Sequence, residues 1–259
     1  DTVTITACAG ACRQSVSEHM LATLLAMCRN LPQARDNPRE HKWVNIKQMR
    51  TIREYKSDLE KAYMQTIEVL RHVVESRDKA TKGHSDRVAL LAKELAEELQ
   101  LSSDDVEMVH VAGLFHDVGK IGIPDSILLK DGTLTKEEFQ TIKGHPAEGE
   151  RIIFSYAPFK KLLSIVRGHH ERYNGTGYPD GKAGEEICLG ARIIAVADSF
   201  DAMMSNRTYR KGLGFDKAMD ELIHSKGTQF DPNIVDAFMK LVEKNGRAKF
   251  EQMYDGCIE

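Results

Sequence analysis

Imidazole and carboxylate side chains stand together at the end of an apolar helical stretch in this 259-residue sequence. The stretch from Val106 to Leu114 leads into the pair His116-Asp117, which Gly119 and Lys120 follow at once. A borderline divalent cation accepts imidazole and carboxylate as ligands, glycine lets a substrate approach the backbone, and lysine supplies a compact positive charge for an anion. The pattern indicates a metal site with an anionic substrate, and a chance pair at a helix end is the alternative.

Residues of the same kind recur along the chain, which contains ten histidines. Five histidines and two aspartates lie at or near the ends of predicted helices: His84, His116, Asp117, His145, His169, His170 and Asp198. Taken singly, each is more often a polar residue satisfied by its surroundings than a ligand. Ligand-type residues on five successive helices, with two adjacent pairs among them, are hard to explain by packing alone.

The elements that must position these residues are predicted to be helices. Apolar residues repeat at helical spacing from Val88 to Leu99. Thr135-x-x-Glu138 is a capping box for the helix that is expected to carry His145, and Asp231-Pro232 opens a later helix. No convincing run of strands appears after residue 78, so the sequence predicts an all-α domain.

Two further segments bear on the arrangement of the site. Residues Asn174 to Gly181 are too rich in turn formers to be anything but a loop. An apolar helix that begins at Ala191 is expected to end at Asp198, with Asp201 one turn further on.

In this order and with these neighbours, the residues resemble the HD-GYP family over about residues 70 to 245. The matching motifs are His84, His116-Asp117-x-Gly119-Lys120-Ile121-Gly122-Ile123-Pro124-Asp125, His145-Pro146-x-x-Gly149, His169-His170-Glu171-Arg172-x-Asn174-Gly175-x-Gly177-Tyr178-Pro179 and Ala197-Asp198-x-x-Asp201-Ala202. The resemblance implies an HD-type helical bundle that hydrolyses the second messenger cyclic-di-GMP to linear pGpG. Further hydrolysis to GMP is left open.

The resemblance also implies a dinuclear metal centre. One ion is then held by His84, His116, Asp117 and Asp198, and Asp117 bridges to a second ion held by His145, His169 and His170. Seven residues with one bridging carboxylate give each ion four bonds, which leaves positions for a water and for phosphate oxygens. Some members hold a third metal through a glutamate that is Ala80 here, so we expect two ions, iron or manganese.

Other positions of the family motifs imply contacts with the substrate. These are Lys120, Gly177, Tyr178, Pro179, Arg207 and Arg210. Besides the metal ligand Asp117, catalysis is expected to use Lys120, which can pair with a phosphate oxygen as charge builds, while Tyr178 can stack on a base. Three more residues are expected to orient the metal ligands and the loop from Asn174 to Gly181. These are Arg172, Asn174 and Asp201. A solvated position for the two arginines and a purely structural role for the last three are the alternatives.

Two other functions compete with the phosphodiesterase. The first is a regulatory module without turnover. It would bind cyclic-di-GMP, or a diguanylate cyclase of the GGDEF type, through the loop that contains Gly177-Tyr178-Pro179 (the GYP loop). The second is an HD-type phosphohydrolase that acts on mononucleotides. The intact ligand set argues against the first, and the loop from Asn174 to Gly181, which simpler HD proteins lack, argues against the second.

Residues 1–45 resemble a fragment of the D-2-hydroxyacid dehydrogenases. The resemblance is carried by Ser15-Val16-Ser17-Glu18-His19, Leu24-Leu25-Ala26 and Arg29-Asn30-Leu31-Pro32-Gln33-Ala34. No glycine occurs between Gly10 and Gly83, so the loop that would hold a dinucleotide pyrophosphate is missing. We interpret this piece as a helical appendage, a dimerisation element or a fused remnant, and the resemblance carries no chemistry.

Residues 46–78 are predicted to form a connecting helix ahead of the main domain at 79–259. Residues spaced alternately four and three positions apart form a coiled-coil-like seam about three heptads long. They are Ile52, Lys56, Leu59, Tyr63, Thr66, Leu70 and Val73. One interpretation is a coiled-coil stalk that transmits a signal from an N-terminal partner and could join two chains as a homodimer. The other is a single amphipathic helix that packs on the main domain.

Composition limits the remaining possibilities. The net charge of −3 gives no general attraction to a nucleic acid polymer. The longest apolar run, Met20 to Cys28, is about half the length that a membrane span needs. Five cysteines without a CxxC pair are typical of reduced thiols, so we expect a cytoplasmic protein.

Overall fold

The computed structural model describes residues 83–130, 132–154, 160–206 and 211–254, together with ten positions between Glu54 and Val69. The chain divides into two compact units, Asp1–Gln65 and Thr66–Glu259. The ten positions are all helical, as expected for the connecting helix. The dehydrogenase-like fragment lies outside the described residues, as do most seam residues. No described helix combines the length and the apolar character that crossing a membrane would require.

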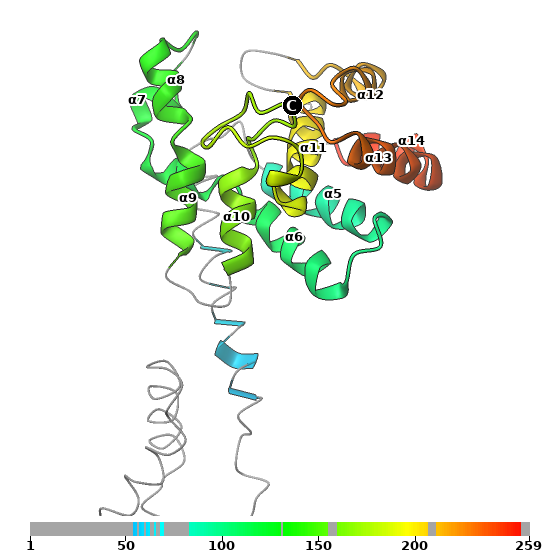
Figure 1. Cartoon of the computed structure of the whole chain (residues 1–259), viewed down its shortest axis with the longest axis horizontal. Helices are drawn as coiled ribbons and strands as arrows, with labels where there is room; N and C mark the ends of the chain where they lie inside the picture. Colours follow the sequence, from blue (N-terminus) through cyan, green and yellow to red (C-terminus); the bar gives the residue numbers. More distant parts are fainter. Residues whose placement is uncertain are drawn as a thin grey trace, which may run out of the picture. The chain divides into compact units, whose positions relative to one another are not determined.

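The second unit consists of helices joined by loops (Figure 1). In chain order these are α5 (His84–Glu98), α6 (Ser103–Phe115), η3 (Val118–Gly122), α7 (Asp125–Leu128), α8 (Lys136–Ile142), α9 (His145–Ile153), α10 (Lys160–Gly168), η5 (Gly184–Glu186), α11 (Leu189–Met204), α12 (Phe215–His224), α13 (Pro232–Asn245) and α14 (Arg247–Gln252). The described residues contain no strand, and their isolated bridges join Asn174 to Ala183 and Lys226 to Phe230. The predicted all-α fold is confirmed.

Helix α5 forms the centre of the core. Its residues at helical spacing are fully buried: Val88, Ala89, Leu91, Ala92, Leu95 and Ala96. Helix α6 packs closely against it, because a Cβ added at Gly113 would lie 2.6 Å from the Cα of Ala89. This contact brings the C-terminal end of α6, where His116 lies, beside α5.

A second part of the core lies between α11 and the C-terminal helices. The Phe200 ring of α11 packs against the rings of Phe215, Phe238 and Phe250, with centroid distances of 6.1, 4.9 and 6.4 Å. Figure 1 shows α12, α13 and α14 on the side of the bundle opposite α7 and α8. These aromatic contacts hold the C-terminal half of α11 in position.

Local sequence signals begin several of these helices. The Ser102 side chain accepts a hydrogen bond from the Asp105 amide at the start of α6. Thr135 and Glu138 form the predicted capping box of α8. The Asp231 carboxylate accepts a hydrogen bond from the Asn233 amide, ahead of Pro232. The predicted helix starts at Thr135 and Asp231 are therefore confirmed.

Two local predictions were wrong. Helix α11 does not end at Asp198 but continues to Met204, because Asp201 is buried and paired with residues of α5. The helix capped at Thr135 does not carry His145, because it ends at Ile142 and the chain turns at Lys143 and Gly144 before His145 begins α9. His84 is buried, with 5% of its surface exposed.

Candidate metal centre

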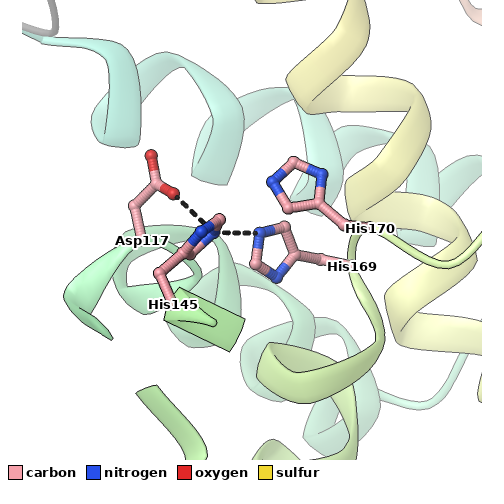
Figure 2. A group of neighbouring side chains, drawn as sticks. All are labelled: Asp117, His145, His169 and His170. Carbon is pink, nitrogen blue, oxygen red and sulfur yellow. Dashed lines mark hydrogen bonds and ion pairs between the residues drawn. The ribbon is translucent and has the colours of Figure 1, made fainter. Parts of the chain in front are cut away.

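The seven candidate ligands lie at the ends or inner faces of five helices. His84 begins α5, His116 and Asp117 follow α6, His145 begins α9, His169 and His170 follow α10, and Asp198 lies within α11. Two sets of these residues have ligand atoms that all lie within 4.8 Å of one another. The first set is Asp117, His145, His169 and His170, and the second is His84, His116 and Asp117. Figure 2 shows the first set, with side chains from separate segments pointing toward one another.

Close backbone packing brings Asp117 and His145 together. A Cβ at Gly119 would lie 1.9 Å from the carbonyl oxygen of His145 and 2.5 Å from the amide nitrogen of Gly149. The segment η3 therefore packs against the N-terminal end of α9 at a distance that only glycine permits. The glycine after the His-Asp pair thus has a packing role.

The Asp117 carboxylate is shared between the two sets. Its Oδ1 lies 3.2 Å from Nε2 of His145. Its Oδ2 lies 3.5 Å from Nε2 of His116 and 3.8 Å from Nε2 of His84. Each oxygen therefore faces a different set of imidazoles, which is the arrangement that a bridging carboxylate requires.

Backbone carbonyls determine which imidazole nitrogen carries the proton. In three histidines Nδ1 lies at hydrogen-bond distance from the carbonyl oxygen three residues earlier. His116 bonds to Gly113 at 2.7 Å, His145 to Ile142 at 2.8 Å and His169 to Val166 at 2.7 Å. A carbonyl oxygen only accepts, so Nδ1 must donate and Nε2 of the neutral ring holds a lone pair.

These lone pairs face one another without protons between them. Nε2 of His145 and Nε2 of His169 are 3.2 Å apart, the contact dashed in Figure 2. Nε2 of His116 is buried and lacks a hydrogen-bond partner among the described residues. Converging lone pairs repel, and an unpaired buried acceptor is costly. A divalent cation would resolve both problems, so the residues present fit a bound metal.

His84 is oriented by a carboxylate instead of a carbonyl. Its Nδ1 lies 2.7 Å from Oδ2 of Asp201, and its Nε2 lies 3.4 Å from Oδ1 of Asp198. Burial lowers the pKa of His84, but the hydrogen bond to Asp201 and the charge of Asp198 outweigh it and raise the pKa. Asp201 also accepts a 2.6 Å hydrogen bond from Nε of Arg87. A carboxylate that accepts a hydrogen bond from a ligating imidazole fixes the orientation of the ring and determines which ring nitrogen carries the proton.

Burial favours the neutral form of His116, His169 and His170. It lowers the pKa of His169 well below its ordinary value, with further lowering from the charges of His170, His116 and His145. It lowers the pKa of His170 to about 3. Neutral imidazoles are the form that binds a metal, so the pocket favours cation binding at physiological pH.

Lys120 and Tyr178 lie directly beside these residues. The Lys120 Nζ is 2.6 Å from Oδ2 of Asp117. The Tyr178 ring lies 4.9 Å from the His170 ring at an interplanar angle of 35°. Burial raises the pKa of the Tyr178 phenol, so the ring stays uncharged. A cation and an aromatic surface are therefore available next to the candidate ligands.

Glu171 organises the loop that carries Tyr178, a role that sequence reasoning missed. It is 3% exposed, and its carboxylate accepts hydrogen bonds from the backbone amides of Asp180 at 2.7 Å, Gly181 at 3.1 Å and Lys182 at 3.1 Å. Its position directly after the His169-His170 pair was the available signal. Glu171 ties the far end of the loop to the pair of histidines.

Other residues of the loop contribute to its shape. A Cβ at Gly177 would lie 2.3 Å from the backbone nitrogen of Arg172, so the loop folds tightly on its own start. Oδ1 of Asn174 accepts hydrogen bonds from the amide and hydroxyl of Thr176. Pro179 is partly buried and Arg172 is exposed. Neither Asn174 nor Arg172 has a hydrogen bond to a candidate ligand in the described part of the chain. Arg207, Arg210 and Ala80 lie outside it.

The HD domain family matches residues 68–234, which is more than half of the chain. A cyclic di-GMP phosphodiesterase response regulator from Xanthomonas campestris pv. campestris is 38% identical over 232 residues, which are 89% of this chain and 60% of that protein. A cyclic di-GMP phosphodiesterase from Thermotoga maritima is 41% identical over 194 residues, which are 74% of this chain and 53% of that protein. The chain thus spans less than two thirds of either relative.

A solved structure shows the same fold. The crystal structure of a cyclic GMP-AMP specific phosphodiesterase from Vibrio cholerae superposes with a TM-score of 0.52 and 18% identity, and covers 71% of this chain and 52% of that chain. The motif order, the helical bundle and the family match agree with one another. The chain belongs to the HD domain family.

Proposed function

We propose that this chain is a metal-dependent phosphodiesterase that hydrolyses cyclic-di-GMP to linear pGpG. The observation that carries the proposal is the Asp117 carboxylate, whose two oxygens face two sets of buried imidazoles. Hydrolysis of a phosphodiester requires charge stabilisation on both sides of the phosphorus, and a shared carboxylate between two cation sites suits this need. The likeness to two relatives named as cyclic di-GMP phosphodiesterases supports the choice of substrate.

We further propose that two divalent ions bind at this centre. His84, His116, Asp117 and Asp198 would hold one ion, and Asp117, His145, His169 and His170 the other. The lone pairs of His145 and His169 and the unpaired Nε2 of His116 support this assignment. Ligation rich in nitrogen with some carboxylate suits iron or manganese. When bound, such ions supply Lewis acidity and a water of lowered pKa.

The side chains of the protein have separate tasks in this reaction. The Lys120 ammonium, beside Asp117, would pair with a non-bridging phosphate oxygen as negative charge grows there. The Tyr178 ring would stack on a base and hold the substrate over the candidate ligands. Asp201 and Arg87 would hold the His84 ring in its productive orientation. The arginines Arg207 and Arg210 stay predicted contacts for the substrate.

The domain organisation is proposed with the same function. We assign catalysis to residues 79–259 and a connecting role to the helix over 46–78. Contact with GGDEF-type cyclases through the Tyr178 loop, and a homodimer through the connecting helix, stay predictions.

A product assay tests the function directly. Full-length protein purified without oxygen is analysed for iron and manganese, then incubated with cyclic-di-GMP, other cyclic dinucleotides and nucleoside monophosphates. We expect about two metal ions per chain and pGpG as the first product. Intact cyclic-di-GMP after incubation with metal-replete protein would overturn the proposal. Cleavage of nucleoside monophosphates alone would favour the phosphohydrolase alternative.

A further inference from the structure

Lys143 carries a positive charge near the metal centre that no predicted motif assigns. It is the residue after α8 and lies two positions before His145. Its Nζ is 5.0 Å from the centre of the Phe139 ring and 5.3 Å from the centre of the Tyr178 ring. Because the Tyr178 ring is itself 4.9 Å from the His170 ring, the ammonium lies within about 10 Å of that candidate ligand ring.

The charge of Lys143 is not neutralised within the described part of the chain. Lys120 pairs with Asp117 and Lys130 pairs with Glu138, but no ion pair joins Lys143 to a described carboxylate. The aromatic faces of Phe139 and Tyr178 attract an ammonium without cancelling its charge. The Lys143 ammonium therefore keeps its capacity to bind an anion. It lies against Tyr178, the ring proposed to stack on a base of the substrate.

We propose that Lys143 binds the second phosphodiester of a cyclic dinucleotide, the one that is not being cleaved. This inference rests on the proposed function. Two phosphodiesters are joined through two riboses in one small ring, so both lie close to the site when either is bound. With one phosphodiester beside Asp117 and Lys120 and a base on Tyr178, the remainder of the ring lies along the Tyr178 loop. Lys143 supplies a cation at that position.

A purely stabilising role makes a different prediction. Lys143 follows the last turn of α8, where a positive charge interacts favourably with the helix dipole. In that case its removal would lower thermal stability, and the hydrolysis of every substrate would change alike. In the proposed role, only substrates with a second phosphodiester lose affinity.

The test compares two substrates in three variants. Lys143→Met removes the charge and keeps most of the side chain, and Lys143→Arg keeps the charge. Lys136→Met removes an exposed lysine from the first turn of α8 and is the matched control. The substrates are cyclic-di-GMP and bis(p-nitrophenyl) phosphate, which has a single phosphodiester. We expect Lys143→Met to lower the ratio of the two kcat/KM values about tenfold, mainly through KM for cyclic-di-GMP. Lys136→Met should stay within about twofold of the parent protein, and Lys143→Arg should retain a larger part of the ratio than Lys143→Met.

A binding measurement separates this inference from the proposed function. Equilibrium dialysis of cyclic-di-GMP against chelated protein, in which no turnover occurs, should give a Kd about tenfold higher for Lys143→Met. If the parent protein binds cyclic-di-GMP but never cleaves it, the proposed function fails and the Lys143 comparison still stands. Equal binding by parent and Lys143→Met, or equal loss of both hydrolytic activities, would overturn the inference. Absence of both binding and cleavage of cyclic-di-GMP by the metal-replete parent protein would overturn both.

Discussion

The Lys120 ammonium lies 2.6 Å from Oδ2 of Asp117, so the carboxylate shared by both candidate ligand sets already has a positive partner. Burial alone would raise the pKa of Asp117, but Lys120 and the imidazoles of His116 and His145 hold it well below its ordinary value. The carboxylate is therefore ionised at every physiological pH. A bound cation would share this carboxylate with Lys120 or free the ammonium to meet the substrate.

Lys120 is predicted to act in the chemical step and not in metal binding. Lys120→Met should lower kcat for cyclic-di-GMP about 10²-fold, because one preorganised positive partner of the developing phosphate charge is lost. The metal content should not fall, since the ammonium competes with cations for Asp117. Metal analysis and steady-state kinetics on the same preparation check both statements. A variant that loses its metals together with its activity would show that Lys120 is structural.

Asp117 is predicted to be indispensable for metal binding. Asp117→Asn keeps the shape of the side chain but removes the charge shared by both sets, so the bound metal should drop from about two ions to at most one. Activity should fall by about three orders of magnitude, the equivalent of several kcal/mol of charge stabilisation. Asp125→Asn, at an exposed position at the start of α7, is the control and should keep metals and activity. Full metal content in Asp117→Asn would contradict the assignment.

Asp201 should act on the metal only through His84. Asp201→Asn weakens the 2.7 Å hydrogen bond that orients the His84 ring and leaves Arg87 without its carboxylate partner. A carboxylate that hydrogen-bonds to a metal-ligating histidine typically contributes about 10–100-fold to metal affinity. We therefore expect metal affinity to fall by about that factor, measured by competition with a chelator. Because the partly buried Arg87 loses its negatively charged partner, Arg87→Met in the same background should restore part of the lost thermal stability. Unchanged affinity in Asp201→Asn would contradict this role.

Glu171 is predicted to stabilise the Tyr178 loop. Glu171→Ala leaves the amides of Asp180, Gly181 and Lys182 without their acceptor, which should cost about 1–3 kcal/mol of the free energy of unfolding. KM for cyclic-di-GMP should rise, because Tyr178 is then less well positioned. Urea denaturation and kinetics provide the measurements. Glu185→Ala, at an exposed position in η5, should change neither value. Equal effects of the two substitutions would argue against a special role for Glu171.

The metal-free protein should lose stability as the pH falls below 6.5. The pKa values of His116, His169 and His170 are lowered in the folded state, so the unfolded chain binds more protons below the ordinary value of 6.5. The free energy of unfolding then decreases with falling pH. The cost approaches about 1.4 kcal/mol per pH unit for a histidine that stays neutral. His84, whose pKa is raised, acts in the opposite direction but is one group against three.

Urea denaturation of chelated protein at pH 7.5 and pH 5.5 measures this dependence. His170→Asn, which cannot titrate, should show a smaller loss over the same interval. Equal stability of the chelated protein at both pH values would show that the buried imidazoles do become protonated in the folded state.

The helical architecture and the identity of the chemical groups were predictable from sequence alone. The capping box at Thr135 and the N-cap at Asp231 depend on residues two or three positions apart, so their outcome is local and readable. The same holds for the His-Asp and His-His pairs, where the order of residues and the glycines around them were sufficient to indicate a metal site. The HD domain match and the all-α fold agree with that interpretation.

Only the tertiary structure decided how these groups are used. Asp201 reaches His84 across 117 positions in the chain, and this pairing extends α11 beyond its expected end at Asp198. The inward direction of Nε2 in His116, His145 and His169 depends on carbonyls that the helix ends present, and the position of Lys143 depends on where the Tyr178 loop folds. Such contacts arise from packing between distant segments. Periodicity and spacing describe only neighbours along the chain, so they carry no information about them.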